Sequence, residues 1–196
     1  FKTFQISIYP YLCKTLNFFN STSLNPSFSQ AQTVNQDHFI IRIKPSSSPF
    51  STALETLQTQ IGYKFQNIGL LRRAMTHSSF SRANNIALGI FGETLISTSF
   101  SLQCLDKNVD MSGKDLNDRI SEISNVESSC AVDAMRLGLE KVVRVSPKTN
   151  SSVPTVVCGA FRAIFGAIAL DSGKLDVAGD VFVRVHGGQI GEALAM

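Results

Sequence analysis

From residue 54 to about residue 171, apolar residues recur at the three- and four-residue spacing of amphipathic helices. This periodicity constrains the fold more than any other feature of the chain. Two-residue alternation, the mark of a half-buried strand, is confined to 38–45 and to a weaker candidate at Val181 to Val185. The expected helices cover residues 54–61 ending at Gly62, a short segment capped by Asn67, about 87–105, a long stretch from Ser112 to Gly138, and 157–171 ending at Gly173. The sequence therefore predicts an all-α domain.

Residues 1–53 differ in composition from the remainder of the chain. They are rich in Ser, Thr, Asn and Phe, and they hold four cations against a single acid, Asp37. Such a basic, hydroxyl-rich and acid-poor segment is typical of an organelle transit peptide, and a disordered extension is the alternative. We therefore expect a leader or extension over 1–53, which includes the loop-like KPSSSPFST at its end, and one domain over 54–196. A mitochondrial location is expected, with the plastid as the alternative.

The net charge of +3 lies entirely in that first segment, so residues 54–196 hold equal numbers of cations and acids. The domain as a whole thus lacks the strongly basic character of many nucleic-acid-binding proteins. Any contact with RNA must come from the local placement of cations. No membrane contact is expected, because the most apolar run, 157–170, is shorter than the roughly 18 residues of a spanning helix and contains Arg162.

The four cysteines, Cys13, Cys104, Cys130 and Cys158, lie far apart and form no C-x-x-C pair. This spacing argues against a zinc site and against a disulfide framework. The expected state is buried or partly buried thiols in a reducing compartment.

Three stretches, in order along the chain, resemble the motifs of ribonuclease III domains. IGYKFQNIGLLRRAMTHSSF (61–80) is similar to the family's opening, G-Y-x-F-x-N-x-x-L-L-x-x-A-L-T-H-x-S. NIALGIFGETLI (85–96) resembles the signature N-E-R-L-E-F-L-G-D-A-V-L, and VVCGAFRAIFGAIALDSG (156–173) resembles the last motif, A-D-x-x-E-A-L-I-G-A-I-Y-L-D-x-G. The resemblance implies the all-α ribonuclease III endonuclease fold, with dimerisation through the signature helix.

The resemblance also implies a metal site, because the family cleaves double-stranded RNA with Mg²⁺ held by carboxylates from two helices. In this chain the five acid positions fall on Ile86, Gly89, Glu93, Gly159 and Arg162. Glu93 alone keeps a carboxylate, and Arg162 brings a fixed positive charge. We expect Glu93 to be vestigial and paired with Arg162. No metal or cofactor is expected, with Mg²⁺ required only if the domain is an active nuclease.

Other polar residues of the domain are expected to be structural or solvated. Asp115, Asp118 and Glu122 share one helical face near a helix N-terminus, where acids are favoured, so they do not rebuild the metal site. His77, in the T-H-x-S motif, is expected to have a structural role rather than to act as a general base. The candidates for contacts with RNA phosphates are Arg72, Arg73, Arg82, Lys114 and Arg119.

These features favour a non-catalytic ribonuclease III-like protein that binds structured or double-stranded RNA, with ribosomal RNA foremost. Its expected setting is an organellar ribonucleoprotein, such as the mitochondrial large ribosomal subunit or an rRNA-processing particle. Two alternatives stay open: an active Mg²⁺-dependent double-stranded-RNA endonuclease, and an inactive dimer partner of such an enzyme. The expected partners are therefore RNA and neighbouring proteins.

Overall fold

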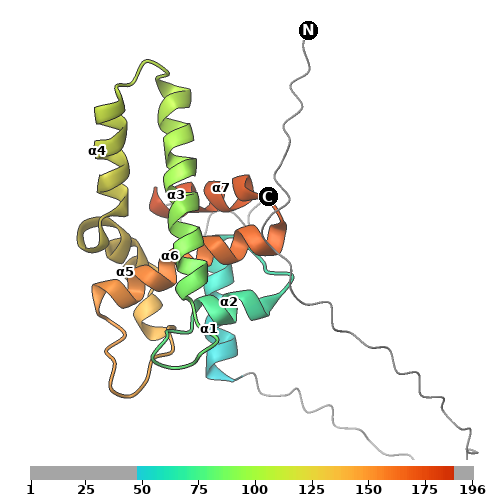
Figure 1. The fold of residues 1–196 in the computed structure, drawn as a ribbon. Coiled ribbons are helices and arrows are strands. Elements are labelled where there is room, and N and C mark those ends of the chain that lie inside the picture. The colour runs from blue at the N-terminus through green and yellow to red at the C-terminus, as the bar shows by residue number, and fades with distance from the viewer. Residues whose placement is uncertain (1–47, 188–196) are drawn as a thin grey trace, which may run out of the picture. The chain divides into compact units, whose positions relative to one another are not determined.

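The computed structural model describes residues 48–187, which form an all-α domain (Figure 1). Two long helices, α3 (Ile86–Lys107) and α6 (Pro154–Ser172), cross and make the most extensive contact in it. The other elements are α1 (Pro49–Ile61), α2 (Ile68–Ala74), α4 (Gly113–Ser124), a π-helical turn at Val126–Cys130, α5 (Ala131–Arg136), a 3-10 turn at Leu139–Lys141 and α7 (Leu175–His186). The all-α prediction is confirmed for these residues, and the possible strand at 38–45 lies outside them.

The ends of several helices follow from single residues. Gly62 and Gly173 adopt φ values of 64° and 69° and end α1 and α6, as the sequence predicts. The start of α1 differs from the prediction, because the helix begins at Pro49, within the expected loop. Proline is favoured in the first helical turn, where no N–H donor is needed, and the Ser48 hydroxyl accepts a hydrogen bond from Ser51 N at 3.2 Å.

Two sequence-based expectations about the helices are wrong. The long helix expected up to Gly138 is interrupted at Asn125, whose backbone is extended and whose side-chain oxygen accepts from the N–H groups of Glu127 and Ser128 at 3.0 and 2.9 Å. Asparagine competes with the helix by forming such local bonds. The alternation at Val181 to Val185 is not a strand, since it lies inside α7, where Val181, Phe182 and Val185 face the core.

The helix α6 occupies the centre of the core. By length and composition alone it could cross a membrane, but two thirds of its most apolar window is buried against other helices of the domain. Phe161 and Phe165 pack edge to face at 4.9 Å, and Phe165 meets Phe182 of α7 in the same way at 5.4 Å. Its apolarity is thus that of a buried core helix.

The crossing of α3 and α6 depends on glycine. A Cβ atom at Gly92 would lie 1.8 Å from the carbonyl oxygen of Arg162, and one at Gly166 would lie 2.3 Å from that of Leu88. The two backbones are therefore in direct contact. This closeness holds the next residue of α3, Glu93, beside Arg162 of α6.

A partly buried acid connects the first motif to the last. Asp171, near the end of α6, accepts hydrogen bonds from Tyr63 Oη at 2.9 Å and from the N–H groups of Gln66 and Asn67, both at 2.8 Å. Burial and this bond to Asp171 raise the pKa of Tyr63 to about 12. The turn before α2 is thereby fixed to the core helix, and Asn67 caps α2 as predicted by accepting from Gly69 N at 3.0 Å.

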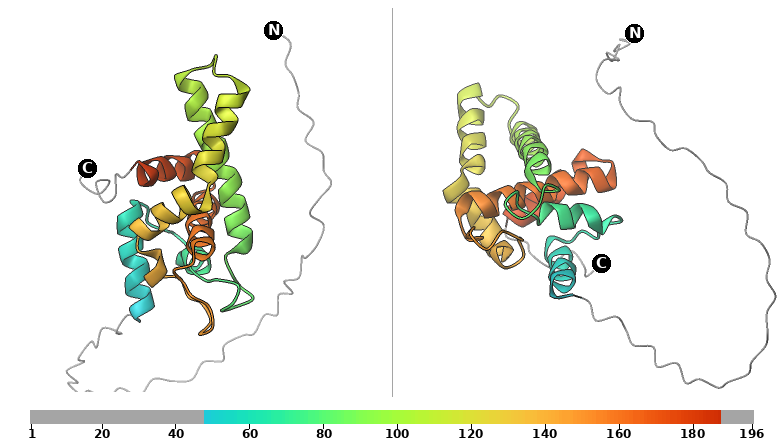
Figure 2. Two further views of the ribbon diagram at one scale, coloured as in Figure 1. Left: turned by 90° about the vertical axis from the view of Figure 1, so that its left-hand side faces the viewer. Right: turned by 60° about the horizontal axis from the view of Figure 1, so that its bottom comes forward.

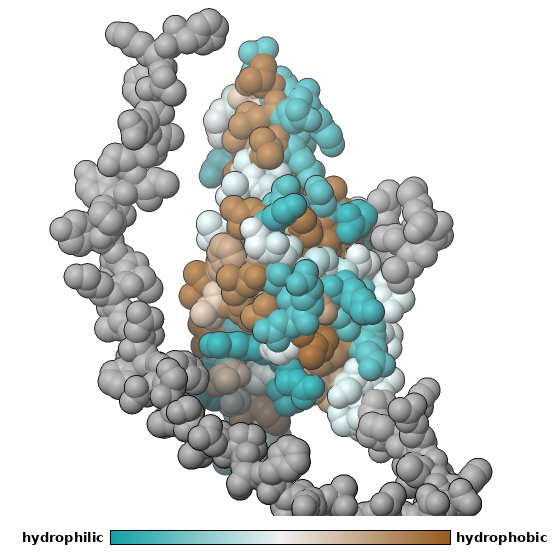
Figure 3. Space-filling model, turned by 90° about the vertical axis from the view of Figure 1, so that its right-hand side faces the viewer, coloured by the Kyte–Doolittle hydropathy of each residue, from teal (hydrophilic) through white to brown (hydrophobic). Residues whose placement is uncertain are grey.

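The second half of α3 and the antiparallel α4 project beyond the other helices as a hairpin (Figures 1 and 2). Several of its apolar residues are poorly covered, with Leu102 70% and Val109 80% exposed. Figure 3 shows apolar surface over this projection, interleaved with polar side chains.

Candidate functional site

The five positions that correspond to the family's acids converge on one pocket. It has a volume of about 220 Å³ and lies between the first half of α3 and the start of α6. Its walls come from the signature segment, from α6 and from the T-H-x-S loop. The lining residues are His77, Asn85, Ile86, Gly89, Ile90, Glu93, Thr155, Gly159 and Arg162.

An ion pair occupies one end of this pocket. Arg162 Nη2 lies 3.0 Å from Glu93 Oε1, and the same nitrogen donates to the carbonyl oxygen of Ser124 at 2.8 Å. The Arg162 side chain is 17% exposed, while that of Glu93 is 45% exposed. The pairing expected from the sequence is confirmed. Arg162 also connects α3 and α6 to the end of α4.

The pocket does not fit Mg²⁺. Ile86, Gly89 and Gly159 offer no side-chain ligand, and Arg162 places a cation next to the one carboxylate. Within residues 48–187 there is no group of three or more His, Cys, Asp or Glu residues that could hold a metal. A Cβ at Gly159 would meet nothing within 4 Å, so packing does not prevent a larger residue there.

His77 belongs to this pocket but is held by its own loop. Its Nδ1 accepts from Ser79 N at 3.2 Å and lies 2.9 Å from Ser79 Oγ. These bonds orient the ring and fix the turn after α2. They support the structural role expected for His77.

The other predicted residues lie outside the pocket. Asp115, Asp118 and Glu122 are exposed along α4, as expected for a solvated face. The RNA-contact candidates fall into two groups, which Figure 1 shows at separate parts of the domain. The first group, exposed on α2 and the loop that follows, consists of Arg72, Arg73 and Arg82. The second group, exposed on α4 of the hairpin, consists of Lys114 and Arg119.

A double-mutant cycle on Glu93 and Arg162 should reveal the coupling free energy of their ion pair. We expect a coupling of about 0.5–1 kcal/mol in the free energy of unfolding, because solvent screens the half-exposed Glu93. Arg162→Met should cost more than Glu93→Gln, since Ser124 would also lose its donor. Urea denaturation of the two single variants and the double variant measures this, and additive effects would show that the pair is not coupled.

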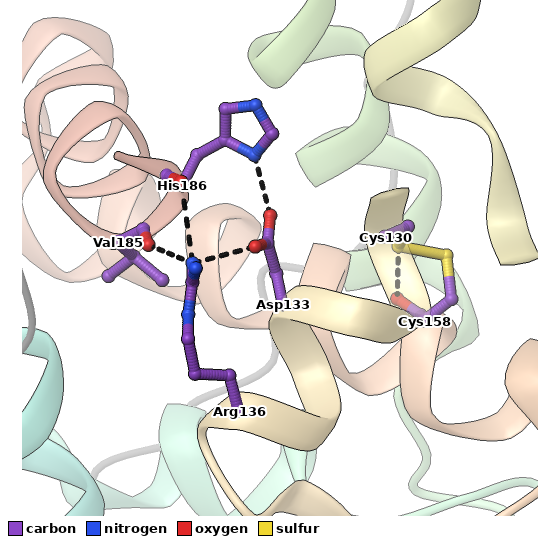
Figure 4. Close-up of polar contacts among 6 residues, drawn as sticks. All are labelled: Cys130, Asp133, Arg136, Cys158, Val185 and His186. Atoms are coloured by element: carbon purple, nitrogen blue, oxygen red, sulfur yellow. Dashed lines mark hydrogen bonds and ion pairs between the residues drawn. A yellow bond between two sulfur atoms is a disulfide. The ribbon is translucent and has the colours of Figure 1, made fainter. Parts of the chain in front are cut away.

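The sequence did not reveal a polar cluster between α5 and the end of α7 (Figure 4). The buried Asp133 accepts from Arg136 Nη2 at 2.7 Å and lies 2.6 Å from His186 Nδ1. Arg136 also donates to the carbonyl oxygens of Val185 and His186. The one local signal was the i, i+3 spacing of Asp133 and Arg136, because His186 is 53 residues away.

This cluster should make stability depend on pH. The hydrogen bond to Asp133 raises the pKa of His186, against the opposing effects of burial and Arg136, and Glu122 adds a weaker upward effect. Because the pKa of His186 is raised in the folded protein, the protonated ring stabilises the fold. This contribution is fully present below the unfolded pKa of about 6.5 and is lost as pH rises through the folded pKa. As pH rises through this range, we expect Tm to fall by about 1–2 °C. The fall is small because solvent screens the His186–Asp133 pair.

Differential scanning fluorimetry over neutral pH measures this effect. His186→Gln should remove the pH-dependent part, whereas His77→Gln should keep it. An unchanged pH profile in His186→Gln would contradict the assignment.

The cysteine expectation is wrong for two of the four residues. Cys130, at the end of the π-helical turn, and Cys158, in α6, form a disulfide with a Cα–Cα distance of 5.2 Å (Figure 4). Cys104 is a buried free thiol, as expected, and Cys13 lies outside the described residues. The wide spacing was misleading because folding brings the two segments together beside the pocket residue Gly159.

Comparisons with known proteins agree with this architecture. Residues 67–185 match the family model described as "Ribonuclease-III-like". The chain is 57% identical over 171 residues to the Arabidopsis thaliana protein NUCLEAR FUSION DEFECTIVE 2, covering 87% of this chain and 90% of that protein. The nuclease domain of ribonuclease III from Campylobacter jejuni superposes with a TM-score of 0.65 at 26% identity, covering 69% of this chain and 96% of that one.

Bacterial ribonucleases are more distant relatives. Ribonuclease 3 of Bordetella petrii is 30% identical over 138 residues, which cover 68% of this chain. The chain spans about half the length of that enzyme, 54%. The chain belongs to the ribonuclease-III-like family.

Proposed function

We propose that this protein is a non-catalytic member of the family that binds structured RNA. The observation that carries this proposal is the Glu93–Arg162 ion pair, at 3.0 Å, in the pocket where the family's carboxylates would converge. A positively charged side chain in place of an acid opposes metal binding. The scaffold residues Gly92, Gly166 and Asp171 still match the family motifs, and in this chain they make the helix crossing and the contacts to the turn before α2.

The setting we propose is an organellar ribonucleoprotein, in a mitochondrion or alternatively a plastid, with ribosomal RNA as the first candidate ligand. The composition of residues 1–53 supports the organelle. The balanced charge of the domain suits a protein that neighbouring proteins help to hold on RNA. Import of the full chain into isolated mitochondria and plastids would test the location.

The alternative of an active nuclease is tested by a cleavage assay on a labelled RNA duplex with Mg²⁺. We expect the duplex to be bound but not cut by the wild-type chain. Glu93→Gln should leave this result unchanged, as should Asp115→Asn, which removes an exposed acid outside the pocket. Cleavage that is lost in Glu93→Gln but kept in Asp115→Asn would overturn the non-catalytic proposal.

A second candidate function, the inactive partner in a dimer, is favoured by the outer face of α3. Ile86 and Ile90 lie next to the pocket and are 53% and 65% exposed. Such apolar residues on the signature helix suit pairing with another ribonuclease III domain. Light scattering of Ile90→Glu, with Val109→Glu on the hairpin as the control, tests this: only the first should weaken association with itself or with a catalytic relative.

A further inference from the structure

Arg144, which follows the 3-10 turn, is held in an unusual environment. Its guanidinium lies 4.3 Å from the ring centroid of Phe50 in α1 and 4.9 Å from that of Phe80. Nη2 donates to the buried Thr76 hydroxyl at 2.6 Å. Two aromatic rings and one hydrogen bond therefore fix the group in place.

No acid neutralises this cation within residues 48–187. Arg144 makes no ion pair there, and its Nε is buried without a hydrogen-bond partner. Its charged neighbour is another cation: Arg72, which lies 5.7 Å from the same Phe50 ring. Burial and the nearby Arg72 both lower the pKa of Arg144. A bound anion would stabilise these two cations, because it would offset their mutual repulsion and the desolvation of Arg144.

These cations are connected to the pocket through one segment of backbone. Arg144 N donates to the carbonyl oxygen of Met75, and His77 N donates to that of Arg144, both at 3.0 Å. His77 lines the pocket, while Thr76 and Phe80, on either side of it, hold the Arg144 side chain. Arg144 is therefore joined directly to the backbone of the pocket residue His77, and RNA bound at the pocket would pass close to this segment.

We propose that Arg72 and Arg144 form a subsite for a phosphate group, which the backbone of bound RNA supplies. The forked guanidinium group suits phosphate oxygens. Phe80, 49% exposed, offers a ring face on which a neighbouring base can stack. This inference rests on the proposed RNA-binding function for the source of the phosphate. The anion site itself does not require the RNA-binding function, because free phosphate has the same chemistry as an RNA phosphate group.

The first experiment probes the anion site without RNA. Inorganic phosphate, added at constant ionic strength, should raise the Tm of the full chain by roughly 3 °C near saturation. Arg72→Gln should abolish this rise. Arg72 is the suitable position because its side chain is exposed and makes no hydrogen bond within residues 48–187, so the fold should tolerate the change. Lys174→Gln, which removes an exposed cation between α6 and α7, is the charge-matched control and should keep the rise.

The second experiment measures binding of an RNA duplex over a range of salt concentrations by fluorescence anisotropy. Losing one phosphate contact should reduce the slope of log affinity against log salt by about 1. It should weaken binding roughly eightfold near 0.1 M salt. We expect both effects in Arg72→Gln and neither in Lys174→Gln. Arg144→Lys, if folded by circular dichroism, should show a similar loss because it lacks the planar fork.

The outcomes separate the two proposals. If wild-type protein shows the phosphate effect but binds no duplex, the proposed function fails and the anion site stands. Equal losses in Arg72→Gln and Lys174→Gln would overturn the subsite, since net charge alone would then explain them. It would also be overturned if an acidic peptide, rather than phosphate or RNA, stabilised the protein through Arg72, because the surface would then be a protein-docking site.

Discussion

Replacing Gly92 with alanine should lower the free energy of unfolding by roughly 3 kcal/mol or more, at the upper end of overpacking effects. The added methyl group would lie 1.8 Å from the carbonyl oxygen of Arg162 and 2.7 Å from its carbonyl carbon. Both are backbone atoms of a buried helix, so no side-chain rotation relieves the clash. The helices α3 and α6 must move apart, and the Glu93–Arg162 pair must lengthen with them. Urea denaturation measures the loss of stability.

Gly159→Ala is the matched control for this variant. It makes the same chemical change in the partner helix, at a position where a Cβ meets nothing within 4 Å. Because alanine favours helix more than glycine does, we expect Gly159→Ala to be neutral or stabilising by about 0.5–1 kcal/mol. If both variants lost similar stability, helix propensity or some general effect of substitution would be responsible, and the close backbone contact would not explain the result.

The contrast between these two glycines shows where sequence reasoning stops. On the face of α6 that carries Gly159 and Arg162, small residues permit another helix to approach closely, and Gly166 does make such a contact. Gly159 has the same side chain and faces open space in the pocket instead. Residue type and helical spacing place a residue on a face. They do not say at which of two glycines on that face an added Cβ atom would meet the other helix.

The convergence of the five acid positions was predictable because the motifs fix their helical phase. Glu93 and Arg162 are far apart in sequence, yet the resemblance places each on a known face, and the structure brings them to 3.0 Å. The Asp133–His186 contact had no such motif to place it. Its partners come from two helices 53 residues apart, and their packing decides whether they meet.

The environment of Arg144 was equally hidden from the sequence. Its partners Phe50, Thr76 and Phe80 lie between 64 and 94 positions away, and an isolated β-bridge pairs Arg144 with Thr76. The break at Asn125 had a local cause, its side-chain bonds, but the surrounding apolar spacing is compatible with a continuous helix. Local periodicity sets the class of the elements, and tertiary contacts set the polar pairs between them.

Reduction of the Cys130–Cys158 disulfide should lower the free energy of unfolding by about 3–4 kcal/mol. The bond closes a loop with a sequence separation of 28, and the loss of chain entropy in the unfolded state for such a loop accounts for this magnitude. For a domain of this size the loss corresponds to a fall in Tm of roughly 10 °C. Thermal unfolding with and without a thiol reductant measures it.

The double variant Cys130→Ser/Cys158→Ser should unfold at about the Tm of the reduced wild type and should not respond to reductant. Cys104→Ser should keep the full response, because Cys104 is a free thiol. A wild-type Tm indifferent to reductant would mean that the two sulfurs are not bonded in solution.

The bond joins the π-helical turn to α6 next to Gly159, and that turn follows Ser124, which accepts from Arg162. Reduction should therefore release the end of α4 from the pocket before the domain unfolds. Amide hydrogen exchange measures this release, and in the reduced protein it should be faster over 124–130 than over α6.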